Sequence, residues 1–246
     1  MKTKLIAIFA LAAFTSCIST PKGHVEENPE VLQTQPFDDG VPVQIEVERG
    51  EEYYHPILAF WIEDMEGNFI ETIYLSQSIA TGTFRFGVAK GGEWMPGERR
   101  RPAALPYWGH RRGEKAPDGL YLPTPQNPVP DAISGATPKT SFLLNTTIKD
   151  GLKRFKVYFE VNQTWDWNHG WHNNLYPDDE EYKTSAQPAL VYVVDVDIDN
   201  PKDVYHFSLI GHSHPSGKTG ELFPDTTKHT TALKIIGDAT LSVQLD

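Results

Sequence analysis

The sequence predicts an all-β fold, an immunoglobulin-like antiparallel β-sandwich with two long irregular insertions. Three observations support this prediction. Short segments in which apolar and polar residues alternate recur through residues 41–246, and a period of two is typical of strands with one buried face. Turn residues, mainly Gly, Pro, Asp and Asn, separate these segments. Outside the N-terminal apolar run, no stretch repeats its apolar residues with the helical period.

Residues 1–16 predict the signal peptide of an exported lipoprotein. A short basic region precedes the apolar run Leu5–Phe14, which is too short to span a bilayer as a helix. Cys17 follows in a context that resembles the lipobox of bacterial lipoproteins, with Phe14 in the place usually held by Leu. We therefore expect Cys17 to carry a lipid that anchors the protein to the membrane, facing the periplasm or the cell exterior. The alternative is ordinary cleavage near Cys17 that leaves a free thiol.

Residues 17–40 predict a flexible tether, because they are polar and rich in Pro, Glu and Gln. Residues 41–246 form the predicted β-sandwich domain. The single cysteine of the chain allows no internal disulfide, so the stability of this domain must come from its apolar core. A formal net charge of −11 argues against nucleic acid as a partner.

The predicted strands follow one another through the domain, each bounded by turn residues. They are Val43–Glu48, Ile57–Glu63, Phe69–Leu75, Ser141–Ile148, Lys153–Gln163, Ala189–Ile198, Val204–Gly211, Thr231–Gly237 and Ala239–Leu245. The turn that contains Gly67 and the turn at Asp150-Gly151 each predict a hairpin between the strands that flank them.

The segment Lys153–Gln163 shows the alternation most clearly, so its two faces can be assigned. One face, predicted to be buried, carries Phe155, Val157, Phe159 and Val161. The other face, predicted to be wet, carries Arg154, Lys156, Tyr158 and Glu160.

The two insertions run from about Gly87 to Pro138 and from about Trp165 to Pro188. Long loops in a compact domain are usually functional or disordered. Both insertions are rich in Trp, Tyr, His and Arg, which disfavours disorder.

Several segments resemble, in the same order, a family of periplasmic proteins. They are His55–Ser76, Leu105–His110, Asp131–Pro138, Tyr158–Asn168, Gln187–Asp199 and Thr230–Val243. Together they are similar to domain-of-unknown-function family 2271, also labelled flagellar-hook-cap-like, from about Val43 to Gln244. The resemblance implies one β-sandwich domain outside the cytoplasm and carries no activity with it.

The segment DAISGAT resembles the flavinylation motif of proteins that carry covalent FMN, such as subunits of sodium-pumping and Rnf-type respiratory complexes. The resemblance implies that a flavin transferase attaches FMN to Thr137 through a phosphoester. The recognition segment would consist of Asp131, Ser134, Gly135 and Ala136. Small residues let the backbone approach closely, and successive backbone N–H groups can cradle phosphate oxygens.

The segment Gly97–Lys115 supplies candidate partners for a flavin. It holds five arginines in an otherwise acidic chain, and an arginine side chain can grip phosphate through two parallel hydrogen bonds. We expect Arg111 to contact the phosphate and Trp108 to stack on the planar ring. The alternative is a solvated basic loop that pairs with surface carboxylates.

Two segments carry histidine pairs. In Trp165–Asn174, His169 and His172 are three residues apart with Asp166 nearby, a set that could ligate a metal, although it meets no tight spacing pattern. The three tryptophans of the segment suggest a sugar or aromatic ligand, or else a loop folded on its own aromatic side chains. The segment Gly211–Gly217 resembles the His-Ser-His-Pro motif of a family of zinc peptidases. Leu222 occupies the position of the serine that those enzymes require, so we expect a tight loop there and no metal site.

Two hypotheses follow. In the first, the protein is a lipid-anchored extracytoplasmic electron carrier with FMN on Thr137, and it exchanges electrons with redox partners of the cell envelope. In the second, it is a cofactor-free immunoglobulin-like module for ligand binding or assembly, and the Ser-Gly-Ala-Thr segment is a turn that leads into the next strand. No Ser-His-Asp order, P-loop or dinucleotide-binding fingerprint is present. We therefore expect no catalytic residues, and a carrier or binding module rather than a stand-alone enzyme.

Overall fold

The structure is a computed structural model that describes residues 28–34, 40–129 and 133–244. The predicted signal peptide, the predicted lipidation site Cys17 and the predicted motif residue Asp131 lie outside the described residues.

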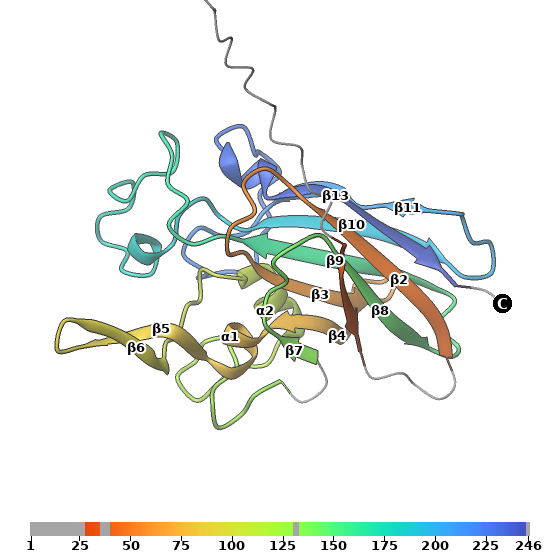
Figure 1. Ribbon diagram of the computed structural model, residues 1–246, viewed down its shortest axis with the longest axis horizontal. Helices are drawn as coiled ribbons and strands as arrows, with labels where there is room; N and C mark the ends of the chain where they lie inside the picture. The colour runs from red at the N-terminus through yellow and green to blue at the C-terminus, as the bar shows by residue number, and fades with distance from the viewer. Residues whose placement is uncertain (1–27, 35–39, 130–132, 245–246) are drawn as a thin grey trace, which may run out of the picture.

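Two sheets pack face to face, and a separate hairpin extends from them (Figure 1). The first sheet has the order β1-β8-β2-β13-β11 and consists of β1 (Glu30–Gln33), β8 (Phe142–Lys149), β2 (Gly40–Arg49), β13 (Ile236–Val243) and β11 (Tyr205–His206). The second sheet has the order β12-β10-β9-β3-β4-β7 and consists of β12 (Ser208–His212), β10 (Leu190–Asp197), β9 (Arg154–Asn162), β3 (Ile57–Glu63), β4 (Phe69–Ser76) and β7 (Ile133–Gly135). Apart from two parallel edge pairs, β1 with β8 and β4 with β7, the strand pairs of these sheets in the described chain are antiparallel. The predicted antiparallel β-sandwich is therefore confirmed.

The first insertion carries more regular structure than predicted. The hairpin of β5 (Thr83–Lys90) and β6 (Glu93–Glu98) projects from the sandwich (Figure 1). Two short helices, α1 (Gln77–Thr81) before it and α2 (Pro106–Arg112) after it, each end at a glycine in the left-handed conformation. Helices of five and seven residues are too short to show a helical repeat, so the periodicity of the sequence did not reveal them.

The core between the sheets contains the side chains that the alternation in β9 assigned to it. Phe155, Val157, Phe159 and Val161 are all at most 1% exposed. The Phe159 ring stacks on Phe60 of β3 with 4.2 Å between ring centroids, and Phe60 meets Phe142 of the opposite sheet edge-on at 6.3 Å. The predicted inward face of β9 is therefore confirmed.

The turn at Asp150-Gly151 does not form the predicted hairpin. Gly151 has a φ of 90°, and Asp150 Oδ1 accepts a hydrogen bond from the Gly151 N–H (2.8 Å), so the chain does reverse there. The strands on either side belong to different sheets, β8 to the first and β9 to the second. Their apolar faces meet across the core, because each needs a facing layer to cover it. The hairpin at Gly67, between β3 and β4, is confirmed.

Two other segments differ from their predictions. Val204–Gly211 is interrupted at Phe207, so that it forms β11 of the first sheet and most of β12 of the second. Phe207 packs edge-on against two core phenylalanines at 6.4 Å, and the chain crosses between the sheets there. Thr231–Gly237 begins as a 3-10 helix, η2 (Thr231–Lys234), and only its last residues enter β13.

The first insertion adds an apolar layer to the outer face of the second sheet. Trp61 of β3 and Tyr158 of β9 point outward and stack with 5.1 Å between ring centroids, and they share one buried cluster with Trp108 of α2. The predicted wet face of β9 is therefore wrong for Tyr158 and Glu160, which are both buried, because α2 covers them. Arg154, at the beginning of the strand, remains exposed.

Two buried carboxylates of the second sheet bind this outer layer. Glu160 accepts hydrogen bonds from the backbone N–H groups of Tyr107 (3.2 Å) and Trp108 (2.7 Å) at the start of α2. Glu63 accepts the guanidinium of Arg111, from Nε to Oε1 at 2.7 Å and from Nη2 to Oε2 at 2.5 Å. Burial raises the pKa of Glu160 to about 8, although the two backbone donors oppose the shift. Buried acids are tolerated only when they are partnered in this way.

Replacing Phe155 or Phe159 by Ala should lower the free energy of unfolding by about 3–5 kcal/mol, because each substitution leaves a cavity in a closely packed core. Lys156→Ala, on the opposite face of the same strand, should change it by less than about 0.5 kcal/mol. Urea denaturation followed by tryptophan fluorescence measures all three variants. Equal losses for Phe159→Ala and Lys156→Ala would contradict the register of β9.

Glu160→Gln should change how stability depends on pH. The pKa of Glu160 is raised from 4.5 to about 8 in the folded protein, so between these pH values the folded state keeps a proton that the unfolded state has released. The stability contributed by this proton is lost as the pH rises through this window, at up to about 1.4 kcal/mol per pH unit. Glutamine does not titrate, so thermal melts from pH 5 to 8 should show the Tm of the wild type falling relative to that of the variant. A Tm difference that is independent of pH would be evidence against the raised pKa.

Candidate functional site

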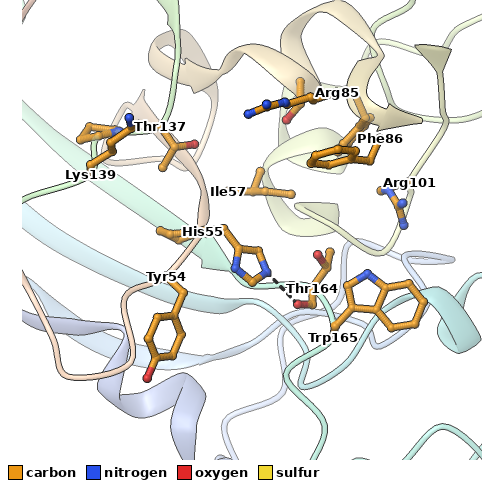
Figure 2. Close-up of a pocket in the computed structure, with 14 residues that line it drawn as sticks. Tyr54, His55, Ile57, Arg85, Phe86, Arg101, Thr137, Lys139, Thr164 and Trp165 are labelled. Atoms are coloured by element: carbon orange, nitrogen blue, oxygen red, sulfur yellow. Dashed lines mark hydrogen bonds between the residues drawn. The ribbon is translucent and has the colours of Figure 1, made fainter. Parts of the chain in front are cut away.

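A cavity of about 760 Å³ lies beside the segment that contains Thr137. Its volume falls within the range of about 300–1,000 Å³ that is typical of small-molecule sites. The lining comes from the segment before β3, from the region of α1 and β5, from the chain before α2 and before β8, and from the start of the second insertion (Figure 2). The lining residues are Tyr54, His55, Pro56, Ile57, Ser78, Phe84, Arg85, Phe86, Arg101, Thr137, Pro138, Lys139, Thr164 and Trp165.

Hydrogen bonds hold the Ser-Gly-Ala-Thr segment against the second sheet. After β7, the Tyr74 hydroxyl donates to the carbonyl of Ala136 (3.2 Å), and the Tyr53 hydroxyl donates to the carbonyl of Pro138 (2.9 Å). Burial raises the pKa of both tyrosines above the ordinary value, so both remain protonated donors. Thr137 Oγ1 lies 3.2 Å from Ser76 Oγ. The half-buried Thr137 side chain therefore has a defined place in the cavity wall.

Only part of the predicted recognition segment reaches the cavity. Gly135 and Ala136 lead to it, and Thr137 lines it. For Ser134 the structure describes the backbone, which pairs with Leu75 of β4. Gly135 has no positive φ, and a Cβ built there would meet the Tyr74 ring at 3.5 Å, an ordinary contact. The fold therefore does not require glycine at this position.

The charged lining of the cavity is entirely cationic. Arg85, Arg101 and Lys139 line it, and the described lining residues include no Asp or Glu. Neither Arg85 nor Lys139 forms an ion pair with any part of the chain that the structure describes. Burial, with the nearby Arg99, lowers the pKa of Arg101, but a guanidinium stays charged at neutral pH. In a chain with a net charge of −11, the basic side chains of this cavity would favour an anion over a cation.

Exposed aromatic side chains form much of the apolar lining. Trp165 is 60% exposed, Phe86 58% and Tyr54 69%, although large aromatic side chains usually bury most of their surface. The Arg85 guanidinium carbon lies 5.2 Å from the centroid of the Phe86 ring. Aromatic faces beside unpaired cations suit a flat aromatic ligand that carries negative charge.

The predicted flavin contacts Trp108 and Arg111 do not lie at this cavity. Trp108 has no exposed surface, and its Nε1 donates to Thr72 Oγ1 (3.1 Å), so neither face of its ring is open to a ligand. The Arg111 guanidinium is bound to Glu63 and to the carbonyl of Gly67, so it is not available to a phosphate. The stacking and phosphate-binding roles predicted for these residues are therefore corrected. Both residues instead hold the outer layer on the sheet. The Trp108 ring packs on the apolar outer face, and the Arg111 guanidinium binds the buried carboxylate of Glu63.

The second insertion folds on its own aromatic side chains. Trp167 and Tyr176 pack edge-on, at 5.6 and 4.7 Å between ring centroids, against the buried tyrosine that begins the 3-10 helix η1 (Tyr182–Thr184). His169 and His172 are exposed. No group of three or more His, Cys, Asp or Glu side chains suited to a metal ion occurs within the described ranges.

His212 and His214 line a second cavity of about 380 Å³. The His212 ring is buried beside Trp171 and Phe223, with ring centroids 5.4 and 5.3 Å away. Burial lowers the pKa of His212 and, for the neighbouring His229, lowers it to about 4. Both rings are therefore neutral at pH 7. The predicted tight loop is present in the turn that follows β12.

Comparison of the chain with protein-family models, curated proteins and solved structures gave no significant match. The resemblances to family 2271 and to the flavinylation motif therefore stay predictions. Among the helices of the described residues, none is long and apolar enough to cross a membrane.

Sequence reasoning missed most of the residues that surround Thr137 in the cavity. Phe86 directly precedes the first predicted insertion and Trp165 begins the second, so the insertion boundaries were a usable signal for both. Lys139 is two residues from Thr137 and could have been included with the motif. Arg101 stood among the five arginines, with nothing local to separate it from Arg111.

Proposed function

We propose that this protein is a lipid-anchored carrier outside the cytoplasm that holds FMN covalently on Thr137 and passes electrons between redox partners of the cell envelope. The observation that carries the proposal is the position of Thr137. The hydroxyl of a segment that resembles a flavinylation motif lies in the wall of a cavity with cationic and exposed aromatic side chains. FMN, when bound, would supply the redox chemistry, and the protein would position and tune it.

The residues around Thr137 fit such a group. The flavin ring is flat and aromatic, and Trp165 and Phe86 offer exposed rings on which it can stack. The FMN phosphate is anionic, and Lys139 lies on the same side of the cavity as Thr137 (Figure 2). A phosphoester on Thr137 would therefore place its charge near a cation that has no carboxylate partner among the described residues.

Attachment requires one hydroxyl from this chain. Thr137 Oγ1 would form a bond to the phosphorus of the FMN half of flavin adenine dinucleotide. The phosphoanhydride bond breaks, AMP leaves, and the transferase takes the hydroxyl proton. Gly135 is consistent with recognition by that enzyme. The fold itself leaves room for a Cβ at this position, so the fold does not explain the glycine. An enzyme that approaches the backbone closely would leave no such room.

A cofactor-free ligand-binding module is the second candidate, and one observation favours it. Thr137 Oγ1 already pairs with Ser76 Oγ at 3.2 Å, so this threonine has a structural contact without any modification. In that case the same cavity would bind its ligand without a covalent bond.

Thr137→Val should abolish flavin attachment, because valine keeps the shape of the side chain and removes the nucleophilic hydroxyl. After co-expression of the full chain with a flavin transferase, mass spectrometry should find one FMN on the wild-type peptide that contains Thr137 and none on the variant. Unmodified wild-type protein from a host with an active transferase would contradict the proposal.

Two matched variants control this experiment. Thr140→Val removes a nearby hydroxyl that donates to the Ser141 carbonyl (2.8 Å), and it should leave attachment unchanged. Gly135→Ala should leave Tm nearly unchanged, because the added Cβ makes only an ordinary contact at 3.5 Å, but it should sharply lower the yield of the adduct. A normal adduct on Gly135→Ala would show that recognition does not need this glycine.

Cys17→Ser should release the protein from membrane fractions or block its processing, because the lipid would be attached to this thiol. Fractionation of cells and the mass of the mature N-terminus measure the two effects. A variant that stays in the membrane fraction and is processed like the wild type would refute the lipid anchor.

A further inference from the structure

Trp165 has an unusual backbone conformation for a bulky residue. Its φ is 67°, and no other non-glycine residue in the described part of the chain has a positive φ. The left-handed region is sterically unfavourable for a residue with a Cβ, above all for a bulky one. Such a conformation persists only where the surrounding structure imposes it, and it is concentrated at ligand sites and other functional positions.

Hydrogen bonds on both sides impose this conformation. The carbonyl of the preceding residue, Thr164, accepts a hydrogen bond from His55 Nε2 (3.2 Å). The carboxylate of the following residue, Asp166, accepts one from Thr231 Oγ1 (2.5 Å). The backbone of Trp165 is therefore held between two attached neighbours.

The strained conformation does not bury the indole. Because the Trp165 side chain is 60% exposed, core packing cannot offset the strain. The ring instead lines the 760 Å³ cavity, which it enters from the chain after β9, while Phe86 enters from β5 (Figure 2). Phe86 is also mostly exposed. A flat ligand in the cavity would cover apolar surface that is now in water.

We infer that Trp165 is a preformed stacking platform that lets the cavity bind free FMN without a covalent bond, before Thr137 is modified. The fused ring of FMN stacks on the indole, and Lys139, which lies across the cavity beside Thr137 (Figure 2), attracts the phosphate. The inference rests on the proposed function for the identity of the ligand, but it requires neither the transferase nor the Thr137 hydroxyl. It adds reversible binding at the same cavity, separate from the attachment reaction, in which flavin adenine dinucleotide is the donor.

Titration of free FMN against unmodified protein, purified from cells without a flavin transferase, tests the inference through quenching of flavin fluorescence. The wild type should quench it saturably. Trp165→Gly should raise the Kd at least about tenfold, as expected for the loss of one aromatic stacking contact. It should leave Tm nearly unchanged, because glycine adopts a φ of 67° without strain. Trp165→Phe should restore part of the affinity. A lower Tm with an unchanged Kd in Trp165→Gly would mean a structural role and would overturn the inference.

Thr137→Val separates this inference from the proposed function. The variant should lose the covalent adduct but still bind free FMN saturably, because the binding surface of Trp165 and the cationic lining do not need the Thr137 hydroxyl. A covalent adduct on the wild type, together with no binding of free FMN by the unmodified protein, would overturn the inference alone. Binding of free FMN without an adduct in a host with an active transferase would overturn the proposed function alone.

The phosphate contacts are tested with riboflavin, which has the same ring and no phosphate. Riboflavin should bind more weakly than FMN, and Lys139→Ala should reduce the difference between the two. Equal affinities of the wild type for riboflavin and FMN would overturn the role assigned to Lys139.

Discussion

The attachment of helix α2 to two buried carboxylates is the constraint on which the rest of the structure depends. Glu160 accepts the first N–H groups of the helix, and Glu63 accepts the guanidinium of Arg111, each with a donor at 2.7 Å. Both acids lie in an apolar layer, where an unpartnered charge would be strongly destabilising. Without α2, Glu160 would lose two backbone donors, and Glu63 would lose the Arg111 guanidinium and keep the indole N–H of Trp61 (2.9 Å). Without the acids, the start of α2 would lose its acceptors. Sheet and insertion therefore stabilise each other.

This attachment also determines where the cavity lies. Asn162, at the end of β9, donates to the carbonyls of Ala103 (3.1 Å) and Ala104 (2.8 Å), just before α2. These bonds hold Ala103 and Ala104, and with them the nearby Arg101, close to the end of β9. Trp165 begins the second insertion three residues after that end. Two insertions that are far apart in sequence thus bring Arg101 and Trp165 to one cavity.

The errors of the sequence predictions share one physical cause. Which strands pair, and which faces of a sheet are covered, depends on segments that are distant in the sequence. Asp150-Gly151 reverses the chain as its turn chemistry requires, but the sheets to which β8 and β9 belong depend on which apolar faces must cover each other. Glu160 alternates with core residues and was predicted to be wet, since nothing within the strand announces that an insertion packs over it. Trp108 and Arg111 were predicted to contact a ligand because their own segment does not show that it packs on a sheet. In the structure both side chains bind residues of that sheet.

By itself, the sequence determined the all-β class, most strand positions and the inward face of β9, and it predicted a role for Thr137 from a resemblance. Each of these depends on neighbours along the chain, and alternation or a short motif records them locally. The surroundings of Thr137 were decided only by the tertiary structure. Lys139 is its neighbour in sequence, but Arg101 and Trp165 come from separate insertions. The places of these insertions follow from the Glu63–Arg111 ion pair, the backbone donors to Glu160 and hydrogen bonds of the loops. A cavity exists only where distant segments meet, and their mutual packing selects which segments those are.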